Sequence, residues 1–185
     1  MREQVGYRTA SDLAALRNNP PMNLESTQLL QVLLHQRRVA ALGTLQDGEP
    51  AVSMVPFVSS PDGGRLVIHV SGLAAHTRNL QASPAVSLMV MDDDRPEQMP
   101  QALPRVSLQG QARVVVVGDP GYTEAKAWYL AKFPDAADLF EFPDFRLVVV
   151  EVREARLVAG FARAHTLYPV DLARHLGGLT APGAS

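Results

Sequence analysis

Cysteine is absent from this sequence of 185 residues. Its absence excludes disulfide bonds, thiolate nucleophiles, iron–sulfur clusters and zinc sites with thiolate ligands. A large net charge is also missing, because 17 basic side chains nearly balance 19 acidic ones and leave a formal charge of -2. This balance gives no reason to expect a nucleic acid or an anionic membrane as the partner.

Long apolar runs are missing as well. The N-terminal stretch MREQVGYRTASDL has no apolar core of the length that a signal peptide needs, and no later segment is long enough to span a bilayer. We therefore expect a cytoplasmic protein. The length suits one well-packed domain. We predict an N-terminal arm over residues 1–24, a main domain over 25–168, and a short helix with a tail over 169–185.

Alternation of apolar and polar residues predicts that the main domain is rich in β-strands. VAALGTL and AVSMVPF, joined by the turn residues Gln46, Asp47 and Gly48, are typical of a β-hairpin. In its second strand Val52 and Met54 share one face, opposite that of Val55 and Phe57. Further strands are predicted over residues 66–71 (half-buried), 85–91 (buried on both faces), 105–117 (bent near Gly110) and 145–158.

Helices are predicted between and around these strands. One begins at Ser26 and has an apolar leucine face, and another follows Asp119 as its N-cap over residues 121–133. Short helices are expected over residues 12–17 and 171–176. No strand–helix–strand repeat is visible, so a closed or partly open antiparallel barrel with helices around it fits the pattern best.

Residues 69–91, HVSGLAAHTRNLQASPAVSLMVM, contain the group of polar side chains most similar to a binding motif. Ser71 is expected to cap a short helix that carries His76, Thr77 and Arg78 in its first two turns. The N-terminus of a helix favours an anion, and these side chains would complete a phosphate pocket. The other interpretation is a capped connector helix with a solvated polar face, and spacing alone favours it.

Four longer motifs occur in order over residues 27–168: LGTLQDGEPAVSMVPF, SGLAAHTRNLQASPAVSLMV, RVSLQGQARVV and FRLVVVEVREARLVAGFARAHTL. Together they resemble the pyridoxamine 5'-phosphate oxidase-like FMN-binding split barrels, most closely their haem-utilisation branch. The resemblance implies a mainly β fold with flanking helices (α+β), namely a six-stranded antiparallel split β-barrel. It also implies a homodimer that holds one FMN per subunit in each of two clefts between the protomers.

The resemblance assigns the FMN site position by position. The second hairpin strand would run past the flavin ring, the short helix would hold the phosphate, and the long strand would reach the flavin from the partner subunit. The residues in these three groups are Ser53, Met54 and Val55; Ser71, His76, Thr77 and Arg78; and Arg105 and Gln109.

Two departures from the family pattern argue against oxidation of pyridoxamine phosphate itself. The strand AVSMVPF has neither the Arg nor the Lys of those oxidases, and FARAHTL does not reproduce their Arg-rich substrate motif. We therefore expect an FMN-dependent oxidoreductase whose flavin does the chemistry, with a substrate that the sequence does not name and no assigned catalytic side chain.

Two alternatives remain open. The first is haem binding or haem degradation on the same barrel, with His165 as the iron ligand, His175 as a weaker candidate, and Arg153, Arg156 and Arg163 for the propionates. The second is a non-catalytic flavin-binding module. No other metal site is expected, because the consecutive residues Asp92, Asp93 and Asp94 point apart and suit a solvated turn.

Overall fold

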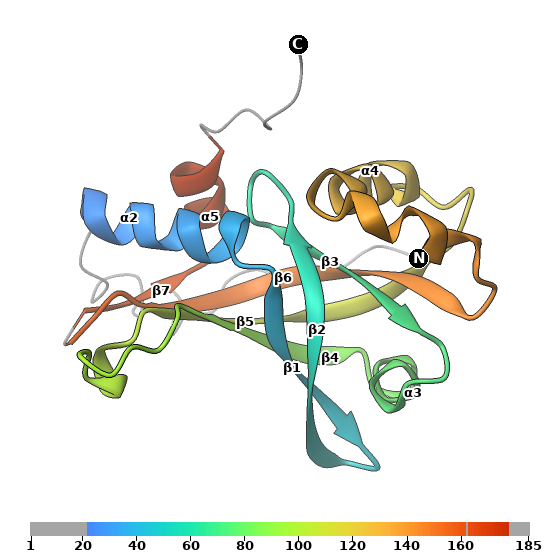
Figure 1. Ribbon diagram of the computed structural model, residues 1–185, viewed down its shortest axis with the longest axis horizontal. Coiled ribbons are helices and arrows are strands. Elements are labelled where there is room, and N and C mark those ends of the chain that lie inside the picture. The colour runs from blue at the N-terminus through green and yellow to red at the C-terminus, as the bar shows by residue number, and fades with distance from the viewer. Residues whose placement is uncertain (1–21, 162, 178–185) are drawn as a thin grey trace, which may run out of the picture.

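A computed structural model describes residues 22–161 and 163–177 of the chain. The predicted helix over residues 12–17, most of the predicted arm and the end of the tail lie outside these ranges. Seven antiparallel strands form one sheet in the order β3-β2-β1-β4-β5-β6-β7 (Figure 1). Pairing of β3 with β6 closes six of them into a barrel, which confirms the predicted fold class. The strands are β1 Val39–Gln46, β2 Glu49–Ser59, β3 Arg65–Ser71, β4 Ala85–Met91, β5 Arg105–Val115, β6 Phe145–Val158 and β7 Ala164–Leu167.

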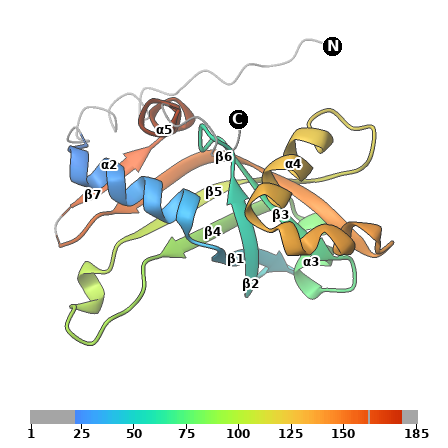
Figure 2. The ribbon, with the colours of Figure 1, turned by 45° about the horizontal axis from the view of Figure 1, so that its top comes forward.

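One end of the barrel is covered by helices from both ends of the described chain. Helix α2 (Leu24–Gln31) continues into the π-helix η1 (Val32–Gln36) and lies beside α5 (Pro169–Leu176), as Figures 1 and 2 show. Leucines of all three join the barrel interior in one buried cluster. The predicted start of the first helix at Ser26 is wrong, because Asn23 is the N-cap and its side chain accepts a hydrogen bond from Ser26 N.

The outside of β3 and β6 carries a second buried cluster. Helix α4 (Tyr122–Lys132) and the 3-10 helix η3 (Pro134–Glu141) pack there, and Tyr129 and Phe133 contact the valines of the two strands. The predicted half-burial of β3 is therefore wrong, because both of its faces are covered. The predicted cap of α4 is also wrong: Gly121 is the N-cap, and Asp119 accepts from Val116 N instead.

The β1–β2 hairpin agrees with its prediction. Asp47 and Gly48 have φ angles of 54° and 87°, the left-handed values that a tight two-residue hairpin turn requires. Val52 and Met54 are exposed on the outer face of β2. Strand β4 was expected to be buried on both faces, and this is wrong: Ala85, Ser87 and Met91 are exposed because no described element covers them.

The predicted bend in the long strand is a β-bulge between Gln109 and Gly110. The strand ends at Val115, two residues earlier than predicted, whereas β6 has the predicted bounds. Helix α5 begins at Pro169 and not at Asp171. Within the described ranges, a bilayer could not be crossed by any of the helices, since none has the necessary length and hydropathy.

Candidate functional site: the outer sheet face

The uncovered side of β1, β2, β4 and β5 forms one continuous surface, which we call the outer sheet face. Strand pairing arranges its residues in rows, because directly opposed residues of antiparallel strands point to the same side. One row runs Val52, Gly43, Ser87 and Gln109, and the next runs Met54, Ala41, Met89 and Ser107. The side chains of these two rows are apolar or uncharged and polar, so the rows themselves carry no charge.

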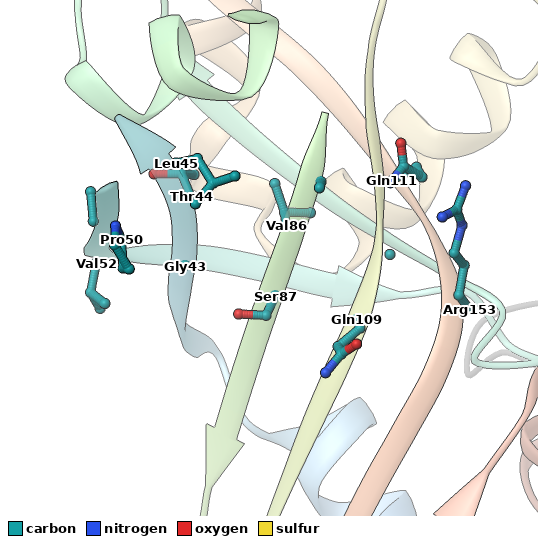
Figure 3. Close-up of a pocket in the computed structure, with 13 residues that line it drawn as sticks. Gly43, Thr44, Leu45, Pro50, Val52, Val86, Ser87, Gln109, Gln111 and Arg153 are labelled. Atoms are coloured by element: carbon teal, nitrogen blue, oxygen red, sulfur yellow. The ribbon is translucent and has the colours of Figure 1, made fainter. Parts of the chain in front are cut away.

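A hollow of about 470 Å³ opens on this face. Figure 3 shows Pro50 and Val52 at one side of it, Val86 and Ser87 in the middle, and Arg153 at the other side. The side chains of Gln109 and Gln111 from β5 also line it (Figure 3). The hollow therefore combines an apolar side with amide and guanidinium groups, which suits a ligand that is apolar with an anionic end. Its lining residues are Gly43, Thr44, Leu45, Pro50, Ala51, Val52, Ala85, Val86, Ser87, Gln109, Gly110, Gln111 and Arg153.

A second hollow, of about 590 Å³, lies further along the strands, on the row that contains Met54, Ala41 and Met89. Met54, Met89 and Met91 line it from the strands, and residues 36–38 and 92–94 form its rim. There Arg37 forms ion pairs with Asp92 and, at 2.7 Å, with Asp93. Two of the three consecutive aspartates therefore bind an arginine and fix the loop after β4.

The predicted flavin-ring residues fall on both sides of β2. Met54 is on the outer sheet face, whereas Val55 is buried in the barrel with an exposed fraction of 1%. The Oγ atom of Ser53 is buried and has no hydrogen-bond partner among the described residues. Gln109 lines the first hollow, but Arg105 donates to the carbonyl of Leu103 at 3.0 Å and is not among the residues that line either hollow. The structure therefore brings Met54 and Gln109 to one face.

The predicted phosphate residues lie around α3 (Ala75–Ala82), whose N-cap is Ala74 and not Ser71. The Ser71 hydroxyl donates to Asp144 Oδ2 at 2.8 Å, and the buried Thr77 hydroxyl donates to the carbonyl of Ser71 at 2.6 Å. Both hydroxyls are thus used within the chain. A phosphate beside Ser71 would be repelled by the carboxylate of Asp144, so Ser71 is a poor phosphate partner in this arrangement.

The other two residues predicted to hold the phosphate, Arg78 and His76, keep some capacity to bind a ligand. Arg78 is exposed and donates one N–H to the carbonyl of Leu73 at 2.7 Å, which leaves other N–H groups of its guanidinium available. The Nε2 atom of His76 is buried and has no hydrogen-bond partner in the part of the chain that the structure describes, and burial lowers the pKa of His76. The assignment of a phosphate to these side chains stays a prediction.

Neither histidine predicted as a haem ligand lies on the outer sheet face, because His165 is on β7 and His175 is on α5. His165 is 5% exposed and opposes the buried Leu157, so its side chain points into the core. The Nδ1 atom of His175 is 3.2 Å from Thr27 Oγ1. The pKa of His175 is lowered, mainly by burial. Because alternate strand residues point to opposite faces, His165 does not reach a ligand on the outer face of its own chain.

The three arginines predicted for propionates have different surroundings. Arg163 forms an ion pair with Glu25, and Arg156 donates to Thr166 Oγ1 at 3.0 Å. Arg153 lines the first hollow, and its guanidinium has neither an ion pair nor a hydrogen bond to any residue that the structure describes. Of the three, Arg153 is therefore the one available to a ligand on the outer sheet face.

Sequence reasoning missed part of this surface, notably Gly43 and Ser87. A signal existed in β4, where the small residues Ala85 and Ser87 alternate with Val86 and Leu88. Read as alternation rather than as a continuous apolar run, this pattern predicts one uncovered face.

Known proteins of similar sequence point to a family. Residues 26–159 match the profile of the family described as pyridoxamine 5'-phosphate oxidase. The chain belongs to this family. Over 118 residues it is 36% identical to the chloroplastic haem oxygenase HOZ of Arabidopsis thaliana, a match that covers 64% of this chain and 34% of the relative. Over 139 residues it is 28% identical to the haem oxygenase HutZ of Vibrio cholerae, a match that covers 74% of this chain and 78% of HutZ.

Solved structures agree with this membership. A haem-binding protein of Mycobacterium smegmatis is 26% identical, with a TM-score of 0.71 over 83% of this chain and 62% of that one. The structure of HutZ, described as a haem storage protein, is 27% identical, with a TM-score of 0.58 over 70% of this chain and 86% of that one. The predicted resemblance to the haem-utilisation branch is confirmed. The chain spans about a third of HOZ and most of HutZ.

Proposed function

We propose that this protein binds haem on its outer sheet face. The observation that carries the proposal is an uncovered apolar surface on the side of a barrel: Val39, Val52, Met54 and Met91 are 49%, 76%, 65% and 43% exposed. Contiguous exposed apolar surface usually marks a binding site, and a porphyrin is a flat apolar ring with carboxylates at one edge. Arg153 stands beside this surface and has the charge that a carboxylate needs.

The similar proteins favour this function over the flavin oxidoreductase that the sequence first suggests. Two relatives are named haem oxygenases, and one solved neighbour is named a haem-binding protein. We extend the proposal to haem degradation, in which haem is the substrate and a reductant and O₂ are consumed.

Titration of the purified protein with haem, followed at the Soret band, tests the binding step. We expect a saturable spectral change with one haem per chain. Met54→Glu should weaken binding, because it places a charge in the apolar surface. Met99→Glu is the matched control, since Met99 is similarly exposed but lies outside both hollows. Haem that binds both variants equally well would contradict the proposed surface.

Addition of ascorbate and O₂ to the haem complex tests degradation. The Soret band should decay with release of iron and appearance of an open-chain tetrapyrrole. A complex that stays intact under these conditions would limit the function to binding or storage.

FMN binding is the second candidate. The observation in its favour is the start of α3, where no side chain caps the backbone N–H groups and Arg78 is exposed. The absorption spectrum of the purified protein separates the candidates, because FMN released on denaturation identifies a flavoprotein. In that case NAD(P)H oxidation that depends on FMN would distinguish an oxidoreductase from a flavin-binding module.

We also propose that two copies pair through the outer sheet face, with the ligand in the hollows between them. The support is the same uncovered apolar surface, which pairing would remove from water.

The expected location of the protein remains the cytoplasm, on the basis of the sequence.

A further inference from the structure

A β-bulge lies at the edge of the first hollow. Gln109 of β5 opposes Glu154 of β6, whereas the next residue, Gly110, opposes Val152. Arg153 is therefore the extra residue of β6, without an opposing residue on β5. Bulges re-aim side chains and are frequent beside functional sites. Here the bulge adds Arg153 to the outer side of β6, whereas the preceding residue, Val152, is buried in the barrel.

Gly110 makes this bulge possible. A Cβ atom at this position would lie 2.4 Å from the carbonyl oxygen of Glu151 and 2.9 Å from Val150 Cγ1. The two strand backbones therefore approach more closely than any residue with a side chain allows. Arg153, which the bulge adds to the strand, lines the same hollow as Gln109 and Gln111.

None of the residues that the structure describes forms an ion pair with Arg153. Glu151 and Glu154 are its neighbours along β6, yet neither forms an ion pair with it among the residues described. The planar guanidinium offers paired N–H donors whose geometry matches a carboxylate, and such charge-assisted pairs are strong and directional. On the opposite side of the hollow, Pro50 and Val52 provide apolar contact (Figure 3).

We propose that the bulge at Arg153 is the carboxylate-binding site of the outer sheet face. Arg153 pairs with a carboxylate at the edge of a flat apolar ligand, and the amides of Gln109 and Gln111 donate beside it. This inference rests on the proposed function and names the residue that would hold a haem propionate. Arg156 and Arg163 are not assigned this role because neither lines the first hollow, and Arg163 already forms an ion pair with Glu25.

The test compares Arg153→Gln with Arg156→Gln, a substitution of the same type on the same strand. Haem affinity should fall by about tenfold to a hundredfold in Arg153→Gln, the usual effect of losing a charge-assisted hydrogen bond, and stay within about twofold in Arg156→Gln. Thermal unfolding should be the same for wild type and Arg153→Gln, because Arg153 is exposed and has no ion pair within the described part of the chain.

A second ligand isolates the carboxylate. Iron protoporphyrin IX dimethyl ester, in which both carboxylates are esterified, should bind wild type and Arg153→Gln with equal affinity. Equal haem affinity in the two proteins, or an equal loss for haem and its diester, would overturn the carboxylate site while haem binding by the wild type stands. Failure of the wild type to bind haem would overturn the proposed function, and the carboxylate site with it.

Discussion

His69 is a buried side chain that neither candidate function uses. Its ring stacks on Phe140 with a centroid distance of 3.9 Å and meets the edge of Tyr129 at 5.6 Å. The Nδ1 atom is buried, and no residue within the described ranges is its hydrogen-bond partner. Burial, together with the positive charge of Lys126, lowers the pKa of His69 from 6.5 to about 4. A neutral imidazole is thus part of the packing between β3 and the α4–η3 helices.

The lowered pKa predicts that stability falls in acid. Between pH 6.5 and about 4 the unfolded chain binds a proton at His69 that the folded chain does not, so unfolding becomes easier as pH falls. The loss between pH 7 and 5 should be about 2 kcal/mol. Urea unfolding of wild type and His69→Leu at both pH values measures it, with the smaller loss expected in the variant. Burial also lowers the pKa values of His35, His76 and His175, and their contribution is common to both proteins.

Gly110→Ala should destabilise the barrel. The added methyl would overlap the backbone oxygen of Glu151, and overpacking of this kind costs about 1–3 kcal/mol. Gly64→Ala is the control, because its Cβ would meet only Asp62 at an ordinary distance of 3.5 Å and should change stability by less than about 0.5 kcal/mol. Denaturant midpoints compare the two variants. If they coincided, the close strand approach at the bulge would be wrong.

At the level of the element, helix starts were the weakest predictions. Ser26, Ser71 and Asp119 each have the right chemistry for an N-cap, yet Asn23, Ala74 and Gly121 occupy those positions. Ser71 and Asp119 use their oxygens nearby instead, accepting from Leu73 N and Val116 N. Capping residues are common in turns, so the sequence alone does not tell which of several such residues begins the helix.

Asn23→Ala should weaken the start of α2. The Asn23 side chain accepts from Ser26 N at 2.8 Å, and loss of such a cap typically costs about 1 kcal/mol. For a chain of this size the melting temperature should fall by about 2–4 °C. Asn23→Ser keeps an acceptor at the cap and should retain most of the stability. Equal melting temperatures for Asn23→Ala and wild type would show that the cap does not contribute.

For the whole molecule, the sequence was enough to predict the barrel but not which of its sides is bare. Hairpin turns and alternation predicted the strands, and motif order predicted the family. Burial of β3 and exposure of β4 depend on where α4 and η3 pack. These helices lie in the connection between β5 and β6, which passes over the outside of β3. The site was only partly predictable for the same reason. Met54 and Gln109 were found by resemblance, whereas Ser87 faces the site only because β4 is uncovered.

The exposed apolar residues of the outer sheet face predict that two copies of the molecule associate through this face. If two copies pair through the outer sheet face, Met54→Glu places a charge in the apolar contact of each copy and should convert a dimer into a monomer. Met99→Glu should leave the dimer intact, although Met99 is 62% exposed and Met54 is 65%. Light scattering coupled to gel filtration measures both masses without a ligand. A wild-type monomer, or a Met54→Glu dimer, would mean that the outer sheet face binds its ligand without a second copy.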